Sequence, residues 1–202
     1  MTEHDVGRTN EAQARLRRRF EAADAFAALV AYGNDQIRRD LWSHWDSPAP
    51  FAKRHPSWYQ ARWGFIPDAD FDWWGIDTYP WFYLHACLDL AGYAVLIHPD
   101  FSGHDVSQAI SQLAPVVELQ HNDLELPSCD GLSPEGALRS IAECLRPSGW
   151  TLIQLRDGNW DAGYIVSAAR KADIPELARL AATADVYELG IIDLTADAAT
   201  RS

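Results

Sequence analysis

The chain has 202 residues, of which 48% are hydrophobic and 23% charged, and it carries a formal net charge of −12 with a pI near 4.8. This length and apolar content allow one domain that buries its own core without disulfides or a metal ion. The negative charge argues against binding to nucleic acid or to an anionic membrane, because both need a basic surface. It favours either a basic protein partner or simple solubility of the chain, and both stay open.

The N-terminal quarter of the chain is predicted to be helical. Apolar residues recur at helical spacing over residues 11–32 and again over residues 35–45, and residues 51–63 fit a short, interrupted helix. We therefore expect an N-terminal helical arm over residues 1–50, followed by a single domain over residues 51–195. Whether the arm packs on that domain is left open.

The dense basic patch of the chain lies in the first predicted helix and consists of Arg15, Arg17, Arg18 and Arg19. Acidic residues precede and follow it, which indicates one face of a charged helix rather than a nucleic-acid-binding arm. The residues before it do not resemble a signal peptide, and no apolar run approaches the roughly 20 residues needed to span a bilayer. Three cysteines without a C-x-x-C pair then favour a reducing cytoplasm with free thiols.

Residues 58–81 mix tryptophans with acids. Alternating carboxylates can converge on Ca²⁺ or Mg²⁺, but here aromatic residues stand where the calcium-loop pattern needs small or oxygen-bearing side chains, so we expect no metal site. The acids then serve as a helix cap and solvated loop charges. The tryptophans suit either a cap on the core or an anchor at an interface, because Trp combines an apolar body with a polar tip, and the sequence does not decide between the two. Its candidate binding residues are Asp68, Asp70, Asp72, Trp73, Trp74 and Asp77.

The middle of the chain shows clearer periodicity. The pattern predicts a helix over residues 80–90 with proline at its first position, and a strand over residues 93–98. Two further helices are predicted over residues 102–113 and 133–145, each preceded or begun by a serine cap. Between them, residues 116–120 are predicted as an extended edge.

The C-terminal third predicts a hairpin of two strands, residues 150–155 and 162–168, followed by a helix over residues 174–183 and a last strand within 186–194. Trp160 lies in the hairpin turn, where it either folds back over the strands or forms an exposed anchor. Together these elements predict an α+β fold, with a small, mostly antiparallel sheet and helices packed on one face, preceded by the N-terminal helical arm.

The candidate catalytic residues surround the end of the strand at residues 93–98 and are His98, Asp100, His104 and Asp105. A carboxylate beside an imidazole can poise it as a base, but no nucleophile, oxyanion site or metal-binding motif accompanies them. We favour the simpler interpretation, in which Asp100 and Ser102 cap the next helix and His98 satisfies a local backbone group.

Two segments carry a familiar pattern: residues 77–113, which include D-T-Y-P-W-F-Y-L-H-A-C-L-D-L-A-G-Y-A-V-L-I-H-P-D, and residues 145–181, from L-R-P-S-G-W-T-L-I-Q-L to P-E-L-A-R-L-A. Over residues 60–190 this order resembles an uncharacterised bacterial family known only as a domain of unknown function. Such relatives carry an Asp-Trp-Lys-like turn after the first strand, where this chain has His98-Pro99-Asp100. The resemblance implies the order of elements and a bacterial cytoplasmic origin, and it brings no known chemistry.

Three functions are compatible with these observations. The acidity, small size, missing catalytic motifs and surplus aromatics favour a non-catalytic protein-binding module, such as an immunity protein that neutralises a basic toxin. Its surface would combine the acids of residues 68–77 with Trp73, Trp74 and Trp160. The alternative is a small hydrolase or metal-assisted enzyme that uses the His98–Asp105 region. The third is a scaffold domain that associates with itself. No cofactor is expected.

Overall fold

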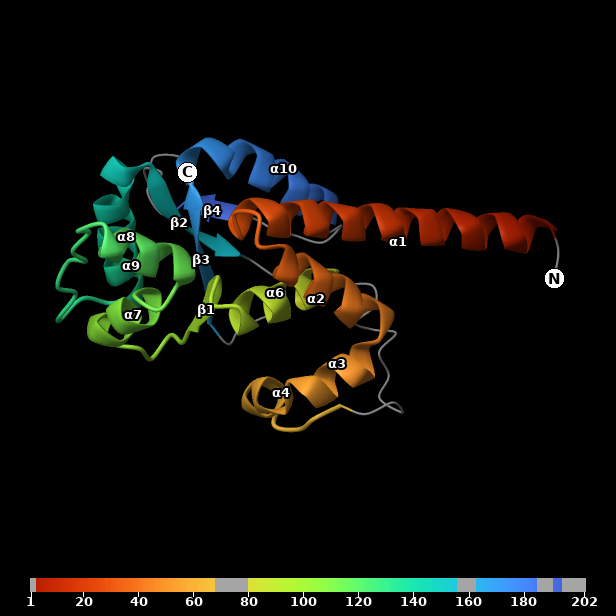
Figure 1. Cartoon of the computed structure of the whole chain (residues 1–202), viewed down its shortest axis with the longest axis horizontal. Coiled ribbons are helices and arrows are strands. Elements are labelled where there is room, and N and C mark those ends of the chain that lie inside the picture. The colour runs from red at the N-terminus through yellow and green to blue at the C-terminus, as the bar shows by residue number, and fades with distance from the viewer. Residues whose placement is uncertain (1–2, 68–79, 156–162, 185–190, 194–202) are drawn as a thin grey trace.

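The computed structural model describes residues 3–67, 80–155, 163–184 and 191–193 (Figure 1). Its helices are α1 (Glu3–Val30), α2 (Asp35–Asp46), α3 (Pro48–Arg54), α4 (Pro56–Trp63), α6 (Pro80–Leu90), α7 (Gly103–Ile110), α8 (Ala114–His121), α9 (Pro134–Leu145) and α10 (Ile174–Ala184). Its strands are β1 (Ala94–Ile97), β2 (Trp150–Leu155), β3 (Tyr164–Arg170) and β4 (Ile191–Asp193). Short 3-10 turns, η1 (Arg146–Ser148) and η2 (Lys171–Asp173), precede β2 and α10.

The strands of the described residues form one antiparallel sheet in the order β1-β3-β2-β4. Its centre is the predicted hairpin, in which Ile153 of β2 lies opposite Ser167 of β3. β1 extends the sheet on the β3 side, with Ala94 opposite the same Ser167, and β4 extends it on the β2 side. The predicted α+β class, the antiparallel sheet and the preceding N-terminal helix are confirmed.

Helices cover both faces of this sheet, whereas the sequence predicted one covered face (Figure 1). Ile153 and Leu155 of β2 face a core that includes α1, α2, α6 and α10, while Leu152 faces a second core formed with α7, α8 and α9. The prediction of one covered face is therefore wrong, and β2 shows why: Thr151, Leu152 and Ile153 are buried in succession, although neighbouring side chains of a strand point to opposite faces. Such continuous burial is typical of a strand covered on both sides.

The C-terminal half of α1 belongs to the first core. It packs against α10, α6 and α2 and buries Phe20, Ala23, Phe26, Ala27 and Val30. The N-terminal half extends beyond the other elements (Figure 1). The structure thus answers the question that the sequence left open, since α1 and α2 both contribute side chains to the core. The division of the chain at residue 50 stays a prediction.

The extended edge predicted over residues 116–120 is wrong, because these residues lie within α8. The β-branched pair Val116 and Val117 favours a strand, but Pro115 occupies the first turn of α8, a position where proline is well tolerated. Val116 is fully buried in the second core. Tertiary packing therefore outweighs the local preference of these residues.

Candidate interaction surface

The residues predicted to bind a partner lie outside the described residues, so their role stays a prediction. They are Asp68, Asp70, Asp72, Trp73, Trp74, Asp77 and Trp160. The chain just before them can be described: Phe65 and Ile66 are 46% and 44% exposed. Two adjacent exposed apolar side chains are compatible with an interface beginning here.

His98 and Asp100 lie in the turn that follows β1, and each contacts the other. The Nδ1 atom of His98 accepts a hydrogen bond from the backbone N–H of Asp100 at 3.3 Å, and the Asp100 carboxylate lies 3.5 Å from the same atom. Their side chains are 51% and 91% exposed. His98 therefore has the local role expected of it, while the Asp100 carboxylate lies beside His98 and the cap of α7 is Ser102.

Asp105 is occupied by the cap of α7. Its carboxylate accepts hydrogen bonds from the backbone N–H and the hydroxyl of Ser102, at 2.9 and 2.7 Å, and Ser102 in return accepts from the Asp105 N–H. This is a capping box. Its hydrogen bonds from the Ser102 side chain and backbone hold the pKa of Asp105 below the ordinary value.

His104 has a different carboxylate partner. Its Nδ1 lies 3.6 Å from Asp130, in the loop between α8 and α9, and both side chains are more than 70% exposed. The candidate catalytic residues thus form separate surface contacts and do not converge in a pocket. Within the described residues no three His, Cys, Asp or Glu side chains are grouped as metal ligands. This geometry gives the hydrolase alternative no support.

These residues share a strongly acidic layer, which we define as residues 98–145, from the end of β1 to the end of α9. It contains one basic residue, Arg139, and eight exposed acids: Asp100, Asp105, Glu118, Asp123, Glu125, Asp130, Glu135 and Glu143. Residues 3–63, which form α1 to α4, contain eight acids and ten Lys or Arg residues. A net charge of −7 out of −12 is therefore concentrated in the layer of α7, α8 and α9.

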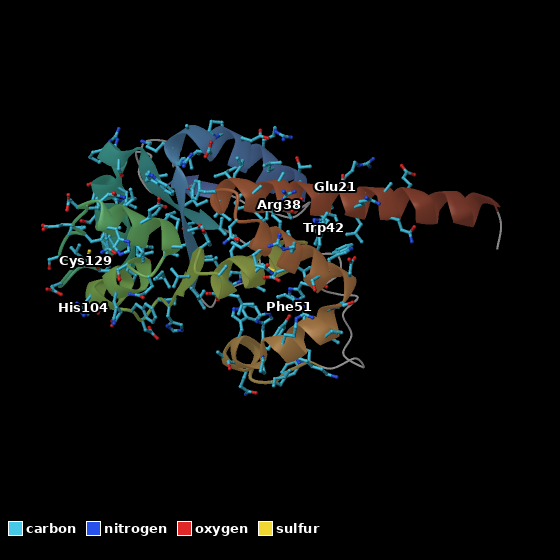
Figure 2. The ribbon with its side chains drawn as sticks, viewed as in Figure 1. Glu21, Arg38, Trp42, Phe51, His104 and Cys129 are labelled. Carbon is cyan, nitrogen blue, oxygen red and sulfur yellow. The ribbon has the colours of Figure 1, made fainter. Side chains whose placement is uncertain are left out.

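The acidic layer lies at the end of the molecule away from the projecting half of α1 (Figure 1). Figure 2 shows His104 and Cys129 at this end, far from Arg38 and Trp42 on α2. The segregation of charge could have been found in the sequence by counting charges segment by segment. What the sequence could not show is that three helices with their connecting loops cover one face of one sheet.

The layer is held on the sheet by its apolar underside. Val106 and Ile110 of α7, with Leu138 and Ile141 of α9, are buried in the second core. Two cysteines lie within the layer, Cys129 and Cys144, and burial raises the pKa of both thiols. They are thus less reactive than an ordinary thiol.

The surface of the layer can steer a cationic partner towards it. Exposed carboxylates act over the range of the Debye length and accelerate encounter, but single exposed ion pairs contribute little free energy. Affinity then needs an apolar anchor. Leu132, between Asp130 and Ser133, is 40% exposed and is the large hydrophobic side chain that the layer offers.

A different surface feature, an open hollow of about 590 Å³, lies beside α1 and α2 and is lined by residues including Asp24, Arg38 and Trp42. Arg38 donates to both oxygens of Asp24, at 2.9 and 2.7 Å, and this pair raises the pKa of the guanidinium. The buried Asp24 carboxylate is thereby neutralised. We therefore explain the hollow as the contact region between α2 and α1, where the Arg38–Asp24 ion pair holds the two helices together.

Comparisons with known proteins agree with the expected resemblance. The model of a family described as a domain of unknown function, DUF6630, matches residues 22–191. The match extends the resemblance predicted over residues 60–190 towards the N-terminus, so that it includes the buried half of α1. No curated protein and no solved structure matches the chain. None of the described helices is long and apolar enough to cross a membrane.

Proposed function

The chain belongs to the DUF6630 family, and because that family carries no assigned activity, we propose from the surface of this member that it is a non-catalytic protein-binding module. Its acidic layer, residues 98–145, receives a basic protein partner. The observation that carries this proposal is the concentration of eight exposed carboxylates against one arginine on a single layer of the fold. Such a surface accelerates association with a cationic protein and repels acidic ones.

The most concrete form of this function is an immunity protein that neutralises a basic toxin. A toxin that is a nuclease is a suitable example. A protein that acts on nucleic acid needs a basic surface, and an acidic layer can cover that surface. The cytoplasm is the compartment where such protection is required, and the three free thiols fit its reducing conditions. The aromatic–acidic segment at residues 68–77 would supply additional anchors.

The test compares capture of host proteins by three versions of the purified chain, at 50 mM and 500 mM salt. The layer variant combines Asp100→Asn, Glu118→Gln and Asp123→Asn, none of which removes a cap of α7 or α9. The control variant combines Glu11→Gln, Asp46→Asn and Asp173→Asn, and so removes the same charge outside the layer. Bound proteins are identified by mass spectrometry, and the affinity of each purified partner is then measured by calorimetry.

We expect the wild type and the control variant to retain a stoichiometric basic protein at low salt and to lose it at high salt. The layer variant should bind the same protein about tenfold more weakly, since three exposed carboxylates each contribute about 0.5 kcal/mol through ion pairs with the partner. Equal binding by the layer variant and the control variant would refute the acidic layer as the binding surface.

A further inference from the structure

A second hollow, of about 280 Å³, lies at the C-terminal end of α1, which points towards the acidic layer (Figure 1). It is lined by the turn after α1, residues 31–34, by Tyr93, which precedes β1, and by Ala114, Pro115 and Glu118 of α8. Sites for small molecules usually enclose about 300–1,000 Å³. The hollow is therefore sized for a small head group rather than for a nucleotide or another large cofactor.

The charges around this hollow favour a cation. Glu118 is exposed, and its carboxylate forms no ion pair with another described residue. Among the described residues no lysine, arginine or histidine lines the hollow. The C-terminal end of α1 adds negative potential, because the aligned peptide dipoles of a helix place about half a negative charge there. The carboxylate and the helix end thus attract a positive group to the same place.

The beginning of α8 also faces the hollow, but it has no N–H group to offer an anion. The N–H of Ala114 donates to the carbonyl of Gly92 at 2.8 Å, and Pro115 has no N–H. The two valines that follow both donate to the carbonyl of Leu113, at 2.8 and 2.9 Å. A helix N-terminus binds anions through free N–H groups, so this one does not oppose the carboxylate of Glu118 with an anion site.

Two tyrosine rings complete the lining. The ring of Tyr32 already carries a cation, since the guanidinium of Arg170 lies 4.7 Å from its centroid. Tyr93 is half-buried, and no described lysine or arginine lies over its ring. Tyr93 is therefore the aromatic side chain that remains for a ligand. An aromatic ring beside a carboxylate is a combination that suits an ammonium or guanidinium group, because the ring attracts a cation through its quadrupole.

We propose that this hollow, which we name the cation pocket and define by Tyr32, Tyr93 and Glu118, binds the charged head of one lysine or arginine side chain. Glu118 accepts the charged hydrogen bonds, and the ring of Tyr93 packs on the head group. Glu118 also belongs to the acidic layer, so the pocket borders the surface that steers a basic protein. The source of the side chain rests on the proposed function: it is that basic partner, which the pocket anchors in addition to Leu132.

The test titrates the full chain with the Nα-acetyl methylamides of lysine, arginine and norleucine and follows the backbone amides by NMR. The norleucine compound has the same apolar stem as lysine without its charge. We expect saturable shifts of the amides of residues 31–34 and 114–118 with lysine and arginine, and none with norleucine. Glu118→Gln should weaken binding about fivefold. Asp123→Asn should bind as the wild type, because it removes a charge of the layer outside the pocket and asparagine tolerates the positive φ of 67° there.

Three results would overturn the cation pocket: equal shifts with norleucine, shifts spread over α7 and α9 without a centre at the hollow, or unchanged affinity in Glu118→Gln. The pocket and the proposed function fail separately. If the lysine and arginine compounds bind at the hollow but the capture experiment retains no basic protein, the proposed function is refuted and the pocket stands. If a basic protein is captured but neither compound binds at the hollow, the pocket alone is refuted.

Discussion

Tyr32 lies in the turn just after α1 and has a left-handed conformation, with φ of 50°, which is rare for an aromatic residue. It occupies a position that usually holds glycine, because the N–H of Gly33 reaches back to the carbonyl of Ala28 as in a Schellman cap. Its ring explains the exception. It lies 4.6 Å from the ring of Trp150, beneath the guanidinium of Arg170, and its hydroxyl accepts a hydrogen bond from the Arg170 backbone N–H.

We predict that Tyr32→Ala lowers the free energy of unfolding by about 2–3 kcal/mol, because it removes the ring and keeps the strained backbone. Tyr32→Phe should cost about 1 kcal/mol or less, since it removes one partly exposed hydrogen bond. Tyr32→Gly should fall between the two, because glycine relieves the strain. Urea denaturation measures all three. Equal losses for Phe and Ala would show that the hydroxyl, not ring packing, stabilises this turn.

At the scale of elements, the start of α7 is determined by a close approach of two chain segments. Gly103, the first residue of α7, donates its N–H to the carbonyl of Leu132 at 3.1 Å. A Cβ atom at this position would overlap the backbone carbonyl of Cys129. The contact seats α7 against the loop that carries Asp130 and Leu132, and so it positions part of the acidic layer.

The substitution Gly103→Ala therefore sets two opposing effects on protein stability against each other: the higher helix propensity of alanine and the steric overlap of its Cβ atom. Propensity alone would stabilise α7 by up to about 1 kcal/mol, but overlap with a backbone atom should instead destabilise the protein by about 1–3 kcal/mol. Gly136→Ala, in the first turn of α9, is the matched control. Its Cβ would lie 3.4 Å from the Ser133 hydroxyl and 3.6 Å from Leu132, so its effect should be neutral or stabilising. Thermal unfolding of both variants gives the comparison, and a stabilising Gly103→Ala would contradict the close approach.

At the scale of the whole molecule, the sequence predicted elements better than their arrangement. Caps and periodicity correctly placed α2, α6, α9, α10 and the β2–β3 hairpin. The second covered face of the sheet was missed. Leu152 and Ile153 lie in different cores, on opposite sides of β2, and this becomes visible only when the neighbours of the strand are known. For the acidic layer, the charge of residues 98–145 can be counted in the sequence, but only tertiary packing shows that α7, α8 and α9 lie together on one face of the sheet.

The two halves of α1 should contribute very differently to stability. The family match begins at residue 22, and the N-terminal half of α1 extends beyond the other elements (Figure 1). The buried half begins at Phe20, whose ring lies 4.6 Å from that of Trp42 and 4.3 Å from that of Trp45. Between the halves, the guanidinium of Arg19 donates to the Ala184 carbonyl of α10 at 2.9 Å.

We therefore predict that deletion of residues 1–14 changes the free energy of unfolding by less than about 0.5 kcal/mol, as for an exposed surface change. Phe20→Ala in the full chain should cost about 3–5 kcal/mol, because it empties a fully buried aromatic site. Urea denaturation at two protein concentrations measures both effects. A large loss on deletion that grows with protein concentration would mean that the projecting half of α1 is stabilised by a second copy of the chain, since only association makes stability depend on concentration.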